Sequence, residues 1–548
     1  MNYKKYKPYE TIKLSNRKWP DKVITKAPIW CSVDLRDGNQ ALEIPMNLEK
    51  KLGFFKYLAD IGFKQIEIGF PAASSTEFSF TRKLIEENLI PEDVTIQVLT
   101  QSRKEIIERT FESLEGVNSA IVHLYNSTSS LQRDVVFKKS KAEIIELAVF
   151  GAKLIKDLSI KYGDHRFIFE YSPESFTGTE MDFAVEICDE VASVWKDKEK
   201  IIINLPATVE MSTPNVYADE IEYFLKNIKL RDKIMLSLHT HNDRGTAVAA
   251  SELGLLAGGE RVEGTLFGNG ERTGNADILN LALNLFSQGI DPKLDFSRIN
   301  DVIEKYEKYT SMEVGPRHPY AGSLVYTAFS GSHQDAISKG MVNIIGKEYW
   351  EVPYLPIDPK DVGREYDAII RINSQSGKRG VSHILESNYG ISLPKYFQQD
   401  FGKFITGISD DKEQELTSKK IYDEFFKKYV NIEKPIELIS YIEEYQDESV
   451  LVKCKLKYNG DEKELSGCGN GLVSAYSNAL ENLTDVKFQV LNYNEHSLEL
   501  GTQSKAITYM HISDENNNYY YGCGINESIT LSSLRALTSA VNRLLDEK

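Results

Sequence analysis

Two histidines and several carboxylates stand at spacings that suit a metal ion. His239-Thr240-His241 places two imidazoles two residues apart, so in an extended strand both face the same side. Residues 34–40 carry two aspartates and an arginine, too polar a set for a core. Two imidazole nitrogens with oxygen donors suit Zn²⁺, Mn²⁺ or a similar ion, and Mg²⁺ less obviously. A lone His-x-His pair is as often structural as ligating, but the acidic segment favours a metal site of Asp37, His239, His241 and Asn275.

Polar side chains also follow other β-rich runs, at His123, Ser172, Glu174 and Thr208. Singly, a serine or threonine there could be the N-cap of the next helix. Together they describe a polar cup that suits a small, oxygen-rich substrate. The glycine-rich run 268–274 lacks the Gly-Lys-Ser/Thr ending of a nucleotide-binding loop, so its glycines more simply permit a sharp turn close to a ligand.

The elements that must position these groups are eight short apolar runs that alternate with amphipathic stretches. The runs are 29–33, 65–68, 95–99, 119–124, 167–171, 200–205, 234–239 and 262–267. They predict parallel βαβ units and an α/β fold, a (β/α)₈ barrel over residues 29–319. An open doubly wound sheet is the alternative; the barrel is favoured because no Gly-x-Gly-x-x-Gly follows the first run and polar clusters follow nearly every run. Barrel closure would place strands seven, eight and one side by side, so that the metal ligands converge.

The remaining chain predicts three further parts. Residues 1–28 form an N-terminal extension, and residues 320–430 a mixed helical linker with an irregular segment at Pro353, Pro356 and Pro359. Residues 431–548 contain two copies of a strand-strand-strand-helix unit, 55 residues apart, each with a Gly-Cys-Gly string before its helix. A pseudo-twofold pair of this kind suits a small effector or a dimer contact, and a purely structural appendage is the alternative.

Composition narrows the class of protein. The net charge of −16 disfavours nucleic acid or an anionic membrane as the main partner. Five cysteines without a Cys-x-x-Cys pair argue against disulfides and thiolate zinc, and for a reducing compartment. No secretory signal and no run of about 18 apolar residues is found, which predicts a cytoplasmic protein.

Taken together, these strings resemble the longer type of 2-isopropylmalate synthases, a family of metal-dependent Claisen-condensing barrels. The resembling strings are 19–21, 35–42, 69–71, 171–180, 204–210, 239–245, 268–275, 330–336 and 373–378. The resemblance implies condensation of acetyl-CoA with 3-methyl-2-oxobutanoate, giving 2-isopropylmalate and CoA, the committed step of leucine biosynthesis. It also implies a homodimer and a C-terminal regulatory domain that binds leucine.

The resemblance assigns roles residue by residue. It implies Asp37, His239, His241 and Asn275 as metal ligands, Arg36, His123, Ser172 and Thr208 as 2-oxo acid contacts, and Glu174 as a substrate-pocket carboxylate. His333 and Tyr366 match family residues that the linker of the neighbouring subunit delivers; His333 is the candidate for orienting or removing the thioester methyl proton, with Tyr366 as a second participant. Arg36 would stabilise the developing oxyanion. By itself His333 would be a surface histidine in a Gly-Ser-His loop.

The chain departs from the family at Leu472 and Ser474, where proline and aspartate are usual, and at Arg379, where relatives tend to carry glycine. Feedback inhibition by leucine is therefore a hypothesis. Alternatives are condensation with pyruvate or 2-oxoglutarate, a lyase on the same barrel, and a non-catalytic relic. Which divalent metal is used (Mg²⁺, Mn²⁺ or Zn²⁺), and whether K⁺ activates, stay open.

Overall fold

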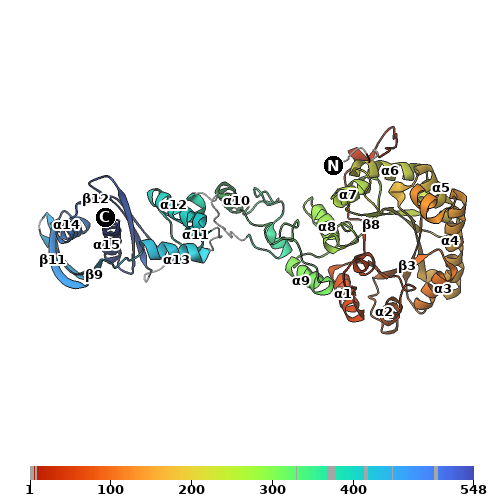
Figure 1. Ribbon diagram of the computed structural model, residues 1–548, viewed down its shortest axis with the longest axis horizontal. Helices are drawn as coiled ribbons and strands as arrows, with labels where there is room; N and C mark the ends of the chain where they lie inside the picture. Colours follow the sequence, from red (N-terminus) through yellow and green to blue (C-terminus); the bar gives the residue numbers. More distant parts are fainter. Residues whose placement is uncertain are drawn as a thin grey trace. The chain divides into compact units, whose positions relative to one another are not determined.

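A computed structural model describes residues 5, 9–328, 330–366, 378–412, 418–446, 448–498 and 504–547 (Figure 1). The chain divides into two compact units: Met1–Val325 with Ile357–Glu365, and Tyr326–Pro356 with Tyr366–Lys548. Residues 373–377 and the side chain of Arg379, both singled out in the sequence, lie outside the described residues. Among the described helices, none combines the length and hydrophobicity that a membrane-spanning helix needs.

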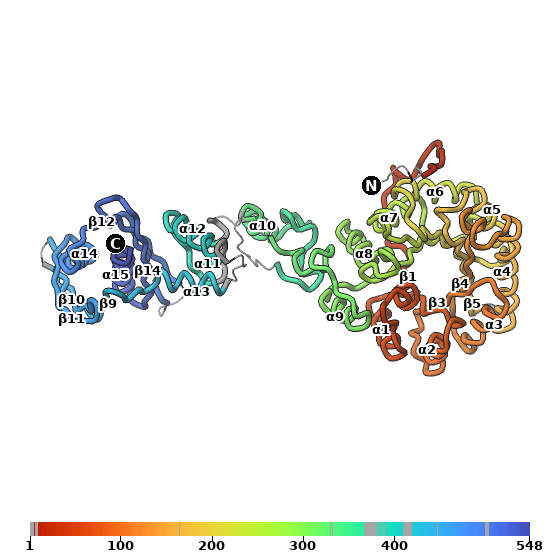
Figure 2. The backbone as a smooth tube through the Cα atoms, viewed as in Figure 1, coloured from red at the N-terminus to blue at the C-terminus, as the bar shows by residue number. Residues whose placement is uncertain are grey.

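Eight parallel strands close into a barrel in the first unit, which confirms the predicted fold over the open sheet (Figure 2). Closure is made by β8 pairing in parallel with β1, as Ile29 opposite Arg261 through Ser32 opposite Gly264. The strands are β1 (Ile29–Ser32), β2 (Gln65–Gly69), β3 (Thr95–Gln101), β4 (Ala120–Ser127), β5 (Phe167–Glu174), β6 (Ile201–Ala207), β7 (Ile234–Thr240) and β8 (Arg261–Gly264).

Helices of the expected pattern surround the strands. They are α1 (Leu48–Ile61), α2 (Ser75–Glu86), α3 (Lys104–Ser113), α4 (Lys141–Gly163), α5 (Met181–Val194), α6 (Pro214–Asn227), α7 (Ala247–Ala257), α8 (Ile278–Phe286) and α9 (Ile299–Thr310). Local signals set their ends: Asn47 caps α1 by accepting from Lys50 N–H at 2.9 Å, and Gly62 ends it at φ +120°. Strand β8 ends three residues earlier than predicted, because the chain turns at Phe267, which adopts φ +57°.

The second unit begins with helices and ends with two small sheets. Its helices are α10 (Gly331–Asn343), α11 (Lys378–Tyr389), α12 (Lys395–Lys412) and α13 (Ser418–Tyr429). As predicted, two three-stranded units with one helix each follow: β9 (Ile436–Gln446), β10 (Ser449–Tyr458), β11 (Asp461–Gly469) and α14 (Leu472–Thr484), then β12 (Phe488–Ser497), β13 (Ala506–Asp514), β14 (Tyr519–Asn526) and α15 (Ile529–Asp546).

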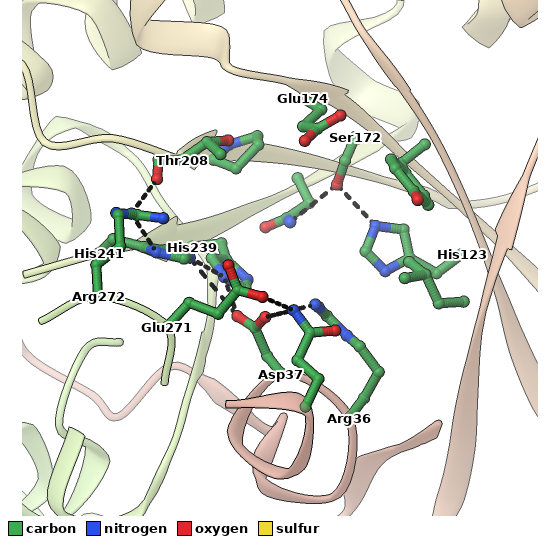
Figure 3. A pocket seen from close by; sticks show the side chains of 15 residues that line it. Arg36, Asp37, His123, Ser172, Glu174, Thr208, His239, His241, Glu271 and Arg272 are labelled. Atoms are coloured by element: carbon green, nitrogen blue, oxygen red, sulfur yellow. Dashed lines mark hydrogen bonds and ion pairs between the residues drawn. The ribbon is translucent and has the colours of Figure 1, made fainter. Parts of the chain in front are cut away.

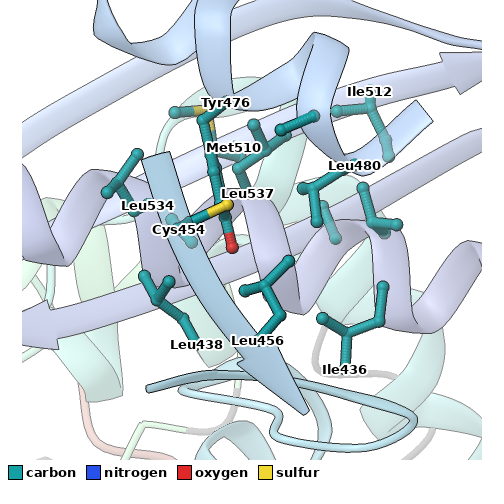
Figure 4. Close-up of a cluster of buried hydrophobic side chains, with 14 of the residues drawn as sticks. Ile436, Leu438, Cys454, Leu456, Tyr476, Leu480, Met510, Ile512, Leu534 and Leu537 are labelled. Atoms are coloured by element: carbon teal, nitrogen blue, oxygen red, sulfur yellow. The ribbon is translucent and has the colours of Figure 1, made fainter. Parts of the chain in front are cut away.

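One buried hydrophobic cluster joins the two copies of the repeat (Figure 4). Leu456 and Leu480 come from the first copy, and Met510 and Leu537 from the second; all four are fully buried. Gly522 and Gly524 of β14 lie against α15 so closely that a Cβ on Gly524 would stand 1.9 Å from the carbonyl oxygen of Ser532. The Gly-Cys-Gly strings therefore allow each helix to pack directly on its strand.

We predict that Gly524→Ala destabilises the protein by about 1–3 kcal/mol, because the added methyl group pushes α15 away from the sheet. The midpoint of urea unfolding, followed by far-ultraviolet circular dichroism, measures the change. Gly407→Ala is the matched control: it lies in α12 of the same unit, a Cβ there meets no atom within 4 Å, and replacing a helical glycine should raise the midpoint. Equal midpoints for Gly524→Ala and the wild type would show that the close packing has no energetic role.

Candidate active site

A pocket lies at the carboxyl ends of the barrel strands, where the sequence predicts the chemistry (Figure 3). Eight of the predicted site residues line it: Arg36, Asp37, His123, Ser172, Glu174, Thr208, His239 and His241. Seven further residues complete the lining: Gln40, Leu99, Tyr125, Asn204, Pro206, Glu271 and Arg272. The pocket is mostly polar, with Leu99 and Pro206 as apolar exceptions.

Three possible metal-ligating atoms converge on one side of the pocket (Figure 3). Oδ2 of Asp37 lies 3.2 Å from Nε2 of His239 and 3.6 Å from Nε2 of His241, and the two nitrogens are 3.2 Å apart. All three side chains are buried. From the described residues, Oδ2 of Asp37 accepts no hydrogen bond of normal geometry. A carboxylate oxygen and two imidazole nitrogens at one point fit a divalent ion.

Asn275 lies beside these residues through the backbone. It forms an isolated bridge with His241, and its N–H donates to Gly268 at 3.0 Å. Its amide nitrogen donates to the carbonyl of Asn269 at 2.9 Å, which fixes the amide orientation. Oδ1 of Asn275 is then a buried acceptor without a hydrogen-bond partner among the described residues. A buried, oriented and unsatisfied oxygen is what a fourth ligand would offer, and Asn275 as that ligand stays a prediction.

Neighbouring charges set the ionisation of the cluster. Burial raises the pKa of Asp37, but Arg36 and the two imidazoles outweigh it and hold that pKa well below its usual range. Burial lowers the pKa of His239, but the contacts with Asp37 and Glu263 outweigh this effect and raise that pKa to about 9. Nδ1 of His239 lies 2.8 Å from Oε2 of Glu263, so the N–H at Nδ1 is held by the carboxylate and Nε2 faces Asp37.

Arg36 and His123 share a carboxylate that the sequence analysis did not single out. Nε of Arg36 donates to Oε2 of Glu67 at 2.5 Å, and Nδ1 of His123 lies 2.8 Å from Oε1 of the same side chain. Glu67 is fully buried on β2. A second guanidinium nitrogen of Arg36 lies 2.9 Å from Asp37. Arg36 is therefore fixed beside the metal-ligand cluster, with its charge directed at the pocket.

The opposite wall comes from β5 and β6. Ser172 lies between His123 and Asn204, with its hydroxyl 2.7 Å from Nε2 of His123 and 3.0 Å from the Asn204 amide. Glu174 accepts a hydrogen bond from Ser127. Thr208 accepts from the backbone N–H of Ser175 at 2.8 Å. These groups form a row of donors and acceptors facing the cluster.

Arg272 connects three of the loops that carry these groups. Its guanidinium bonds the carboxylate of Asp243 at 2.7 and 3.1 Å, donates to the carbonyl of Thr208 at 2.6 Å and lies 2.9 Å from Nδ1 of His241. Arg272 adopts φ +58°, an uncommon conformation for a non-glycine residue. The glycine-rich run thus turns sharply, as expected, and uses the turn to direct an arginine.

His333 and Tyr366 belong to the second unit and are not among the pocket-lining residues. The exposed His333 ring stacks on Tyr354, with centroids 4.1 Å apart. Tyr366 is half-buried, and burial raises the pKa of its hydroxyl.

Models of known families match three consecutive segments of the chain. The HMGL-like family matches residues 27–305, the alpha-isopropylmalate synthase post-catalytic domain-like family residues 323–386, and the LeuA allosteric (dimerisation) domain residues 415–545. The first covers the barrel, and the last covers the two repeats.

Curated relatives match along the whole length. A 2-isopropylmalate synthase of Acetoanaerobium sticklandii is 60% identical over 100% of this chain and 97% of the relative. Proteins of the same name are 55% identical in Clostridium acetobutylicum, over 99% of each chain, and in Desulfitobacterium hafniense, over 97% of this chain and 96% of the relative.

We predict that His239→Ala lowers the affinity for Mn²⁺ at least a hundredfold, because one of the converging ligand atoms is removed. Titration of free Mn²⁺ by electron paramagnetic resonance measures the affinity without any turnover. His165→Ala is the control, an exposed histidine just before the opposite end of β5. Comparable Mn²⁺ binding by His239→Ala and the wild type would exclude the assigned metal site.

Proposed function

This chain belongs to the 2-isopropylmalate synthase family, and we propose that its barrel condenses acetyl-CoA and water with 3-methyl-2-oxobutanoate to give 2-isopropylmalate and CoA. The observation that carries the proposal is the convergence of Asp37, His239 and His241 beside Arg36 in one pocket. The full-length match to relatives of this name supports the same substrates. Its place is then the committed step of leucine biosynthesis.

Asp37, His239, His241 and Asn275 would hold the divalent ion. When bound, the ion supplies a Lewis acid that polarises the ketone of the 2-oxo acid. Arg36, held by Glu67 and Asp37, directs its guanidinium to the point where negative charge develops on the ketone oxygen. Because Arg36 is already fixed, this stabilisation requires little reorganisation during the reaction. The donor set leaves Mg²⁺, Mn²⁺ and Zn²⁺ as candidates, with K⁺ as a further activator.

The 2-oxo acid is oriented by the wall opposite the cluster. His123, Ser172 and Thr208 offer nitrogen and hydroxyl groups for its carboxylate. Leu99 and Pro206 are the apolar members of the lining and suit a branched alkyl group. A pocket of this kind discriminates a single methylene by about 1–3 kcal/mol, so the smaller pyruvate is a weaker competitor rather than an excluded one.

A second cavity beside the pocket offers a route for the thioester. It shares Tyr125 and Glu174 with the first, and its other lining residues include Phe137 and Leu147. Arg103 and Lys139 also line it, and their cations suit the phosphates of CoA. Glu174 therefore stands between the 2-oxo acid and the acetyl group.

Removal of the methyl proton needs a base, and we assign this step to His333, with Tyr366 as a second participant. Both belong to the linker of the second unit, and in our proposal the linker of a partner copy delivers them to the barrel. The match to a dimerisation domain over residues 415–545 supports a homodimer. Glu174 would then accept or relay the proton within the pocket.

Leucine is the proposed effector of the C-terminal repeats, supported by their match to an allosteric domain. Leu472 and Ser474, where the family usually has proline and aspartate, stand at the start of α14, close to the Gly-Cys-Gly string that ends β11. All five cysteines are free, and four are buried, which supports a reducing compartment such as the cytoplasm.

We predict that the protein with Mn²⁺ or Mg²⁺ releases CoA thiol from acetyl-CoA fastest with 3-methyl-2-oxobutanoate. A kcat/KM at least tenfold above those for pyruvate and 2-oxoglutarate is expected from the apolar side of the pocket. Removing the metal with a chelator should stop thiol release, and adding it back should restore the rate. A higher kcat/KM with another 2-oxo acid would change the substrate while keeping the metal chemistry; no release with any of them would contradict the proposal.

We predict that leucine inhibits this thiol release in a concentration-dependent manner. Initial rates across a leucine titration, with isoleucine as the control amino acid, measure the effect. A flat response of the full chain would remove leucine as the effector and leave the departures at Leu472 and Ser474 as the explanation.

A further inference from the structure

The segment that precedes the barrel, residues 9–22, is bound along α6 (Figures 1 and 2). Arg17 forms two hydrogen bonds to the carboxylate of Asp219, at 2.6 and 2.7 Å, and the Trp19 indole N–H donates to the same group at 2.9 Å. Asp219 belongs to a helix of the outer ring, yet it is only 2% exposed. A bidentate ion pair of this geometry contributes more to stability than an ordinary surface ion pair.

A second carboxylate of α6 receives the backbone of the segment. Glu222 accepts from the N–H groups of Lys18 and Trp19, at 2.9–3.1 Å, and pairs with Lys226 of the same helix. Lys226 also donates to the carbonyl of Asn16 at 3.2 Å. The segment is therefore fixed through side chains and backbone, although it adds no strand to the barrel.

Tyr9, at the other end of the segment, reaches the loop that follows Glu174. Its hydroxyl lies 2.7 Å from the carbonyl oxygen of Thr177 and 2.5 Å from Oε1 of Glu220. A phenol has one proton, so it can donate to only one of these oxygens. The other contact needs a proton from Glu220, whose carboxyl then donates to the Tyr9 oxygen while Tyr9 donates to Thr177.

The local environment of Glu220 favours this arrangement. Glu220 is 2% exposed, and burial, together with the charge of Asp219, raises its pKa to about 7 against the lowering effect of the contact with Tyr9. Arg17 pairs with Asp219, and Tyr217, whose pKa burial also raises, remains protonated. As the pH rises through about 7, Glu220 ionises and can only accept a hydrogen bond. The Tyr9 hydroxyl then donates to Glu220, and the carbonyl of Thr177 loses its donor.

The loop that Tyr9 contacts is strained and directly follows a residue that lines the pocket. Ser175 directly follows Glu174 and adopts φ +60°, which a serine holds only when its surroundings impose it. Its N–H donates to Thr208, and the hydroxyl of Thr177 donates to Val209 at 3.0 Å. The hydrogen bond from Tyr9 to Thr177 is a further contact that holds this conformation.

We propose that residues 9–22 act as a strap in which Tyr9 is a positioning residue for Glu174 and Thr208. The proposal rests on the function assigned above. The strap fixes the β5 and β6 loops from outside the barrel, whereas Asp37 and His239 are held by Arg36 and Glu263, which the strap does not contact. Its loss should therefore impair turnover without weakening metal binding.

Tyr9→Phe keeps the ring and removes the hydroxyl. We expect kcat to fall about tenfold at pH 6.5, because the strained loop is no longer held in its productive conformation, while Mn²⁺ affinity stays within twofold of the wild type. Hydrogen exchange at the amides of residues 175–179 should accelerate, with no change in β7. Tyr223→Phe is the matched control: Tyr223 lies on α6, the helix that binds the strap, and its hydroxyl donates to Asp182 of α5 at 2.5 Å without touching the loop.

Glu220→Gln separates positioning from a merely structural role. The amide of glutamine donates to Tyr9 at every pH, so this variant should keep its kcat from pH 6 to 8, whereas the wild type loses activity above about pH 7. If hydrogen exchange at residues 175–179 is unchanged in Tyr9→Phe, or if Tyr223→Phe accelerates it equally, the strap proposal is wrong. A wild type that releases no CoA would contradict the proposed function instead, and the exchange measurement would still test the strap.

Discussion

Arg261 is fully buried inside the barrel, so its charge must be balanced by side chains that face the same interior. One nitrogen donates to Glu263 at 2.9 Å and to Ser237 at 2.8 Å, and another donates to Gln97 at 2.6 Å. The second oxygen of Glu263 holds His239. The orientation of a proposed metal ligand thus depends on a guanidinium that never meets the substrate.

The charges inside the barrel balance because one buried carboxyl group, that of Glu170, is uncharged. His123, Glu170 and Glu263 stand close enough to resemble a second metal cluster, but Arg261 contacts both carboxylates and supplies the positive charge there. Burial raises the pKa of Glu170 to about 8, against the opposing effect of Arg261, so Glu170 is protonated at neutral pH. Glu263 can then stay ionised, which its contact with His239 requires.

The sequence predicted the barrel well because its elements have strong local patterns. Helices α1 and α7 lie in amphipathic stretches between the predicted strands, and the polar ends of β1 and β7 indicated Asp37, His239 and His241 directly. Glu67 and Glu263 were missed because a glutamate in a strand fits equally well on the solvent side; only closure of the barrel shows that both face inward. The Arg-Val-Glu string 261–263, with period two, was the one available signal.

Two kinds of interaction hold the pocket side chains in place, buried ion pairs on one side and hydrogen-bonded loops on the other. A substitution has a different effect on each side. The metal-ligand side is fixed by buried charge on β2, β7 and β8, where any single replacement leaves an uncompensated ion. The substrate side depends on loops with uncommon backbone angles at Ser175 and Arg272, held by hydrogen bonds from neighbouring elements. Changes in the Ser175 loop can move Thr208 or Glu174 while leaving the ligand cluster in place, whereas Arg272 also contacts His241. The two kinds of interaction meet at Glu67, Glu263 and Arg272, each of which contacts groups on both sides of the pocket. A barrel of this construction can therefore change its 2-oxo acid without losing its metal only where these three residues are kept.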